Sequence, residues 1–160
     1  MKSAIFASAA LAISTLGLVA CSDEQATQAD EGNTSQSGIS VTDARLILPA
    51  VAGNPAAVYF TVKNDSERDS FIRAASVKGA QSAVLHQMAM WNGEMTMQEE
   101  FQIPIKAGSE LKFEPGALHV MANDLDESLT AGGTAEVTLT FIGGKSATFP
   151  AEVRAAGDER

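Results

Sequence analysis

The chain has 160 residues and is acidic, because 20 Asp and Glu side chains against 11 Lys and Arg give a formal net charge of −9 at pH 7. Nucleic acids and anionic lipid surfaces attract basic proteins, so this balance argues against nucleic acid as a partner and is compatible with a protein that collects cations. The single cysteine excludes a disulfide within the chain.

Residues 1–20 have the layout of a secretory signal peptide, with Lys2 followed by an apolar run from Ala4 to Ala20 that only small polar residues interrupt. A membrane-spanning helix needs about 20 predominantly apolar residues, and this run is too short and too weakly apolar for that role. We therefore predict that residues 1–20 are removed and take no part in the fold.

The signal ends in "LVAC", which resembles a bacterial lipobox, so Cys21 is the predicted lipidation site and the first residue of the mature chain. The alternative is an ordinary signal peptide with an incidental cysteine. Two or more acyl chains anchor a protein stably, and lipoprotein modification supplies more than one. The predicted location is the periplasm or cell envelope. By resemblance to known lipoprotein sorting, Ser22 in place of aspartate favours the outer membrane if the cell has two membranes.

The segment after the lipidation site contains no large apolar residue and is rich in Ser, Gln, Gly, Asp and Glu. Such a composition cannot bury enough apolar surface to fold, so residues 21–38 are predicted to be the lipidated cysteine and a flexible tether. Residues 39–155 then form one domain of ordinary size, and residues 156–160 form a short polar tail.

Beyond the tether, short runs rich in Val, Ile, Phe and Thr alternate with Gly, Pro, Asn and Asp, which predicts strands. The predicted strands are 39–48, 56–64, 70–77, 82–88, 94–98, 110–115, 117–122, 135–143 and 145–153. No segment has sustained helical periodicity, although 41–47 fits either pattern. The prediction is an all-β domain, either a two-sheet sandwich or a small barrel.

The alternation is clearest in "AEVTLTFI", where Val137, Leu139 and Phe141 point one way and the threonines point the other, so one face is predicted to be wet. Paired glycines at 143–144 separate this run from the next and predict a tight hairpin. "MWNGEMTM" predicts another hairpin, with Asn92 and Gly93 in its turn.

The histidines and methionines of the mature chain are concentrated in one window. After signal removal the chain keeps two histidines and five methionines, all within 86–121: His86, Met88, Met90, Met95, Met97, His119 and Met121. Methionines that only filled a core would not be expected to avoid both flanks of the domain. The clustering itself indicates a site.

The spacing places these residues on common faces. Side chains two apart on a strand share a face, so His119 and Met121 project together while Leu118 and Val120 project into the predicted core. His86 shares a face with Met88, opposite Leu85. The hairpin returns two further methionines toward the first strand, so three segments can bring imidazoles and thioethers to one place.

Thioethers are soft, uncharged ligands suited to Cu(I), and imidazole binds copper among several metals. Zinc sites prefer Cys, His and carboxylates, and a blue-copper site needs a cysteine thiolate, which the folded domain lacks. The competing interpretation is structural, since methionine fills irregular cores and a histidine such as His119 can be satisfied by a hydrogen bond.

The run from His86 to Met121 resembles the periplasmic copper chaperones of the PCuAC family. Their signature is a histidine, ten residues, a methionine, twenty-one residues and then His-x-Met, which falls here on His86, Met97, His119 and Met121 with both gaps unaltered. "AAVYFTVKND", "IPIKAGSELKFEPGALHVM" and "LTAGGTAEVTLTF" also look like the family, so the resemblance covers roughly residues 40–153.

The resemblance implies a cupredoxin-like β-sandwich of Greek-key type that holds Cu(I) at an exposed site through those four residues. It also implies delivery to respiratory oxidase assembly, with the CuA-bearing subunit of cytochrome c oxidase or a thiol-containing copper chaperone as partner. Two features depart from the family. Many relatives have a tryptophan in the first strand where this chain has "DARLI", and some carry a Met- and His-rich C-terminal extension that "RAAGDER" does not match.

The sequence thus predicts a lipid-anchored Cu(I) metallochaperone rather than an enzyme. A copper-sequestering tolerance lipoprotein and a non-metal envelope interaction lipoprotein remain as alternatives. Met88, Met90 and Met95 are either auxiliary metal ligands or a hydrophobic rim. Trp91 either shields the site, belongs to a docking surface, or is simply a packed or exposed indole.

Overall fold

The computed structural model describes residues 38–158, and all of the regular elements in this range are strands. They are β1 (Ile39–Ile47), β2 (Ala56–Asn64), β3 (Ser70–Val77), β4 (Ala80–Trp91), β5 (Glu94–Glu99), β6 (Ile103–Ile105), β7 (Glu110–Phe113), β8 (Leu118–Leu125), β9 (Thr134–Phe141) and β10 (Ser146–Arg154). The all-β prediction is therefore confirmed. No helix in the described range could cross a membrane. The predicted signal peptide, the lipidation site Cys21 and the tether up to residue 37 lie outside the described residues.

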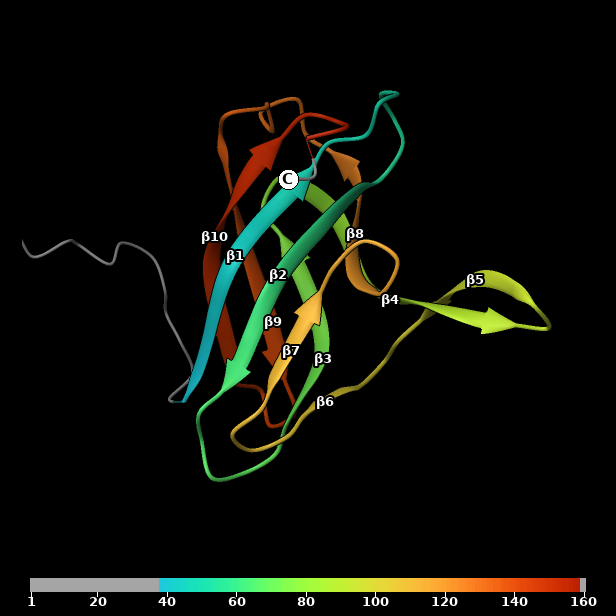
Figure 1. Ribbon diagram of the computed structural model, residues 1–160. Helices are drawn as coiled ribbons and strands as arrows, with labels where there is room; N and C mark the ends of the chain where they lie inside the picture. Colours follow the sequence, from blue (N-terminus) through green and yellow to red (C-terminus); the bar gives the residue numbers. More distant parts are fainter. Residues whose placement is uncertain (1–37, 159–160) are drawn as a thin grey trace, which may run out of the picture.

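The strands form one mixed sheet in the order β5-β4-β8-β7-β2-β1-β10-β9-β3-β6. β1 and β10 pair in parallel, as do β7 and β8, and the other neighbours are antiparallel. β3 and β4 lie second from opposite ends of this order, yet only residues 78–79 join them. The sheet must therefore double back, and its two halves face each other across the core (Figure 1).

The core follows from strand alternation. In β2, the buried side chains Ala56, Val58, Phe60 and Val62 alternate with partly exposed ones. Phe60 is the centre of an aromatic cluster, with ring centroids 4.2 Å from Phe113 and 5.3 Å from Phe149. Such close-packed apolar side chains supply the main favourable free energy of folding.

The wet-face prediction for β9 is confirmed. Val137, Leu139 and Phe141 are buried, while the threonines between them are partly exposed, and Thr138 shares a hydrogen bond of 2.8 Å with Thr148 of β10. The predicted glycine hairpin between β9 and β10 is also present, because both glycines at 143–144 have positive φ and the two strands pair antiparallel.

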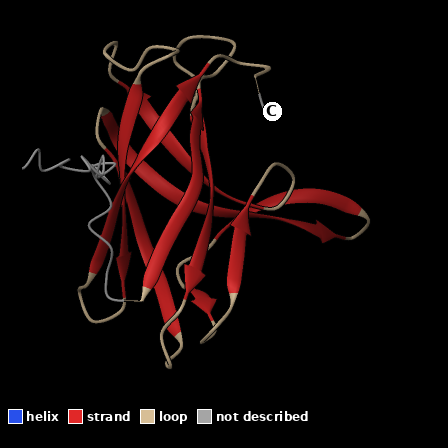
Figure 2. Ribbon diagram, turned by 60° about the vertical axis from the view of Figure 1, so that its left-hand side comes forward, coloured by secondary structure: helices blue, strands red, loops and turns tan. Residues whose placement is uncertain are grey.

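β4 is longer than predicted, and this length creates the most distinctive feature of the fold. The last backbone hydrogen bond from β4 to the β8 segment is donated by Met88 N to Ala117 O, at 3.2 Å. Beyond that point β4 pairs only with β5, around the Asn92-Gly93 turn. The resulting hairpin, which we call the arm (residues 88–97), projects away from the body of the domain (Figure 2).

Candidate metal centre

β8 separates the core from the candidate site, since its alternate residues face opposite ways. Val120 is fully buried in the core, and Leu118 packs against the same cluster. His119 and Met121 therefore project from the other face, as the sequence predicted.

The two histidines face each other across neighbouring strands. β4 and β8 are antiparallel, and their register pairs His86 directly with His119. The ring centroids lie 5.8 Å apart, with an angle of 72° between the ring planes. On the core side of the same strands, Leu85 pairs with Val120, and both side chains are buried. The register that fills the core thus also aligns the imidazoles.

Met97 approaches this pair from β5. It lies opposite Met88, and its Sδ is 3.3 Å from Nε2 of His119. Met97 is 49% exposed whereas His119 is only 8% exposed. The resemblance implied an exposed site; in the structure the thioether is open to solvent and the imidazole behind it is covered.

Met121 completes the set that the sequence singled out. It pairs with Val84 across β4, two residues from His86, and it follows His119 by two residues on β8. Directly paired residues in an antiparallel sheet share a face, so His86, Met97, His119 and Met121 all lie on one face of the β5-β4-β8 layer. Three segments far apart in the chain supply these four side chains.

The hydrogen bonds of His119 fix which ring nitrogen is available. Its Nδ1 lies 3.0 Å from the carbonyl oxygen of Ala117. A carbonyl oxygen only accepts, so in the neutral ring Nδ1 carries the hydrogen and Nε2 keeps a lone pair. Nε2 is the atom that faces the Met97 sulfur. A backbone carbonyl that orients a histidine in this way is typical of metal-ligating imidazoles.

His86 is held in its neutral form. Burial lowers the pKa of this imidazole below its usual 6.5, and the neighbouring His119 lowers it further, while Glu99 acts in the opposite direction. Its Nδ1 is buried and has no hydrogen-bond partner among residues 38–158. A buried polar atom without a partner costs free energy, so an ion that accepts a lone pair from this imidazole would reduce that cost.

The remaining methionines lie on the same face, along the arm. Met88 is opposite Met97, and Met90 is opposite Met95. Trp91 occupies the alternate position, pairs with Glu94 and is 63% exposed. Strand alternation therefore directs the indole to the other face of the arm, away from the methionines.

Sequence reasoning missed three residues around the site. Glu99 pairs with His86 across β4 and β5, on the donor face. Tyr59 of β2 lies beside His119, with ring centroids 6.5 Å apart, and the guanidinium of Arg45 sits 5.1 Å from the centre of the Tyr59 ring. The alternation of "AAVYF" already directs Tyr59 outward, but its closeness to His119 depends on β2 pairing with β8, which no local pattern reveals.

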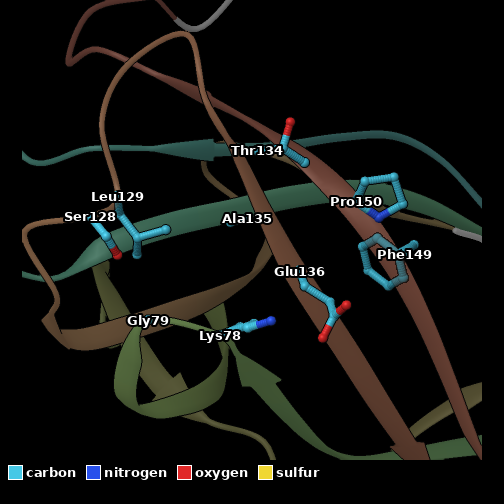
Figure 3. Close-up of a pocket in the computed structure, with 9 residues that line it drawn as sticks. All are labelled: Lys78, Gly79, Ser128, Leu129, Thr134, Ala135, Glu136, Phe149 and Pro150. Carbon is cyan, nitrogen blue, oxygen red and sulfur yellow. The ribbon is translucent and has the colours of Figure 1, made fainter. Parts of the chain in front are cut away.

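Other parts of the described chain offer different chemistry. Residues 38–158 contain no cluster of three or more His, Cys, Asp or Glu side chains suited to a metal ion. A pocket of about 350 Å³ lies between the β3–β4 turn and β9–β10, with Lys78, Leu129, Glu136 and Phe149 among its lining residues (Figure 3). It contains no imidazole or sulfur donor and is separate from the candidate centre.

Comparison with known proteins gives a family and a set of solved folds. The family model described as "Putative lipoprotein LpqE-like" matches residues 39–153. The chain is 32% identical over 142 residues to the "Putative lipoprotein Lxx21020" of Leifsonia xyli subsp. xyli (strain CTCB07), which covers 87% of this chain and 83% of that protein.

Two solved structures extend the comparison. The copper-bound PCuAC domain from PmoF2 superposes with a TM-score of 0.63 at 23% identity, over 77% of this chain and 97% of that one. The CuI-DR1885 solution structure from Deinococcus radiodurans superposes with a TM-score of 0.54 at 25% identity, over 73% of this chain and 78% of that one. The cupredoxin-like sandwich expected from the sequence is the fold of these domains, and the expectation is confirmed.

Proposed function

The chain belongs to the LpqE-like lipoprotein family, and from this premise we propose that it is a Cu(I)-binding metallochaperone of the cell envelope, not an enzyme. The observation that carries the proposal is the convergence of His86, His119 and Met97 on one sheet face, with Met97 Sδ 3.3 Å from the Nε2 that keeps its lone pair. The PmoF2 domain and DR1885, which share the fold, have structures with copper and Cu(I) respectively.

The donor set suits Cu(I) on chemical grounds. Two neutral imidazoles and two thioethers are uncharged, and soft sulfur ligands select Cu(I) over harder divalent cations. The lowered pKa of His86 keeps that ring unprotonated, so a metal ion meets less competition from protons. Outside the cytoplasm, where thiols tend to oxidise, thioethers remain available as ligands.

A carrier must also release its cargo, and the position of Met97 supports release by ligand exchange. His86, His119 and Met121 belong to strands that pack on the core, whereas Met97 belongs to the arm and is half exposed. A two-stranded hairpin outside a core is only marginally stable. Outward motion of the arm would withdraw one thioether and open the ion to an incoming ligand of the recipient.

The rest of the proposal concerns location and recipient. Cys21 is the lipid attachment site, and residues 22–38 tether the domain to the membrane, the outer one if the cell has two. A tether of this length has a root-mean-square reach of roughly 20–25 Å. The recipient is an apo-oxidase copper subunit, such as the CuA domain of cytochrome c oxidase, or a thiol-containing copper chaperone that acts before it.

Anaerobic Cu(I) titration against a competing chelator tests the binding claim, with X-ray absorption to count nitrogen and sulfur neighbours. All test proteins carry Cys21→Ser, so that no thiol binds copper. Loss of a residue that hydrogen-bonds to a metal ligand weakens metal affinity about tenfold or more, and loss of a ligand itself should cost at least as much. We therefore expect His119→Ala and Met97→Leu each to weaken Cu(I) binding at least about tenfold. Thr138→Val, on the far β9, is the matched control. Unchanged affinity in both site variants would favour the non-metal interaction lipoprotein.

A deletion strain grown with scarce copper separates delivery from sequestration. Delivery predicts that the deletion strain loses oxidase activity and that added copper restores it. The wild-type gene should also restore the activity, whereas the His119→Ala gene should not. Sequestration predicts normal oxidase activity at scarce copper and greater sensitivity to excess copper. Direct transfer of Cu(I) from the purified carrier to an apo-CuA domain is the corresponding measurement in solution.

A further inference from the structure

The arm carries more sulfur than the four-donor centre uses. Met88, Met90 and Met95 share the donor face with Met97 but are not part of the centre, and Met90 and Met95 are 63% and 52% exposed. We propose that Met88, Met90 and Met95 form a second, outer Cu(I) site of thioethers alone, which takes up the ion near the tip of the arm and passes it through Met97 to the histidines. This inference rests on the proposed function.

The backbone pattern of the arm brings these sulfurs close together. Glu100 N donates to Leu85 O at 2.8 Å, which makes that pair a hydrogen-bonded position of the antiparallel ladder. Hydrogen-bonded and non-hydrogen-bonded pairs alternate, so Met88 with Met97 and Met90 with Met95 occupy non-hydrogen-bonded positions. Cα atoms there are only about 4.5 Å apart, and the side chains are closer than at the other positions.

The three outer methionines are mutual neighbours. Met90 and Met95 face each other directly, and Met88 is next to Met90 on the same face and diagonal to Met95. Diagonal neighbours on a sheet lie about 7–8 Å apart, within reach of long side chains. Methionine has three rotatable side-chain bonds and a polarizable sulfur, so three such residues can turn their thioethers toward one ion.

The turn and the local charge support uptake of a cation. Asn92 and Gly93 both have positive φ, 50° and 85°, which is the two-residue turn that matches strand twist and keeps the two methionine pairs in register. Between Lys78 and Lys106 the sequence contains three glutamates and no lysine or arginine. This segment therefore carries a net negative charge, which favours the approach of cations.

Continuity with the inner centre gives the outer site its role. From the tip inward, the donor face presents Met90 with Met95, then Met88 with Met97, then His86 with His119. Each step is one two-residue strand repeat, about 6.8 Å. An ion can therefore exchange ligands along the row without leaving the protein, and Met97, which pairs with Met88, is the inner-site ligand that receives it from the outer site. The inner centre adds two imidazoles to its thioethers, and we therefore expect it to hold the ion more tightly than the outer site.

The test is an anaerobic Cu(I) titration of the Cys21→Ser chain against chelators of graded strength, with the methionine methyl groups followed by NMR. We expect a tight first equivalent that shifts the methyl signals of Met97 and Met121, and a weaker second equivalent that shifts those of Met88, Met90 and Met95. The double variant Met90→Leu, Met95→Leu preserves apolar volume. It should lose the second equivalent, keep the first, unfold at the same temperature and load its inner site more slowly.

Trp91→Leu is the matched control, because it changes a large exposed side chain of the same arm on the opposite face and should keep both equivalents. A single equivalent in the parent chain, or a second equivalent that survives in the double variant, would overturn the inference. In that case the exposed methionines serve as an apolar contact surface for a protein partner. Failure of the first equivalent to bind would instead overturn the proposed function, so the two failures are distinguishable.

Discussion

Two adjacent residues of β8 allow the separation of its faces to be tested in one experiment. Val120 lies in the core with no exposed surface, while its neighbour Met121 lies on the donor face and is partly exposed. We predict that Val120→Ala lowers stability and leaves Cu(I) binding intact. Met121→Leu should weaken Cu(I) binding and change stability little.

The magnitudes follow from burial. Val120→Ala removes two methyl-sized groups worth about 0.8 kcal/mol each on transfer, about 1.6 kcal/mol together, and leaves a cavity in a packed core. The total loss should be about 2–3 kcal/mol, which lowers the urea midpoint by about 1–2 M. Met121→Leu conserves volume and apolar character at a partly exposed position, so it should cost less than about 1.5 kcal/mol. It removes a sulfur donor and should weaken Cu(I) binding at least about tenfold.

Urea unfolding of the metal-free proteins, followed by circular dichroism, measures the first quantity, and chelator competition measures the second. The wild-type chain with Cys21→Ser is the reference for both. Equal stability losses in the two variants would refute the assignment of Met121 to the outer face. An unaltered Cu(I) affinity in Met121→Leu would remove it from the ligand set.

Three further predictions concern other parts of the molecule. Buried Asn64 donates to the carbonyls of Arg68 and Ile105 at 2.8 and 3.0 Å and accepts two hydrogen bonds from Ser66. Asn64→Ala should therefore lower the free energy of unfolding by about 3 kcal/mol, measured by chemical unfolding. A loss below about 1 kcal/mol would contradict this prediction. Because the pKa of His86 in the folded protein is below 6.5, the unfolded chain binds more protons than the folded one as the pH falls through 6.5. The metal-free protein should therefore lose stability on acidification, and His86→Gln should reduce that loss. Chemical unfolding at pH 5 and pH 7.5 measures both effects. Gly93→Val places a β-branched residue at φ 85°, which should strain the turn by about 1–3 kcal/mol. Hydrogen exchange in β5 should become faster and Cu(I) binding weaker, while the midpoint of global unfolding stays unchanged.

Strand alternation made the fold and the donor face predictable from the sequence. Val120 and Leu85 could be assigned to the core because apolar residues alternate with polar ones, and His119 and His86 then had to face the other way. The Asn92-Gly93 turn could be predicted because few residue pairs accept positive φ at both positions.

The features that were not predicted depend on contacts between distant segments or on very short elements. β6 has three residues with a proline in the middle, at the edge of the sheet, which is too short for alternation to be visible. The full length of β4 was missed because its last residues pair with β5 away from the core, and burial there no longer alternates. The covered state of His119 comes from Met97 and Tyr59 on two other strands.

The pairing of Leu85 with Val120 behind His86 and His119 has a consequence for the proposed binding of copper. A one-residue slip between these strands would turn the imidazole of the slipped strand inward and its aliphatic neighbour outward, at a prohibitive cost in buried apolar surface. The histidine half of the proposed binding centre is therefore preorganised by the folded state itself. Capture of an ion requires little ordering of the scaffold, and the entropy of binding is expected to come chiefly from desolvation and from the few bonds of the methionine side chains.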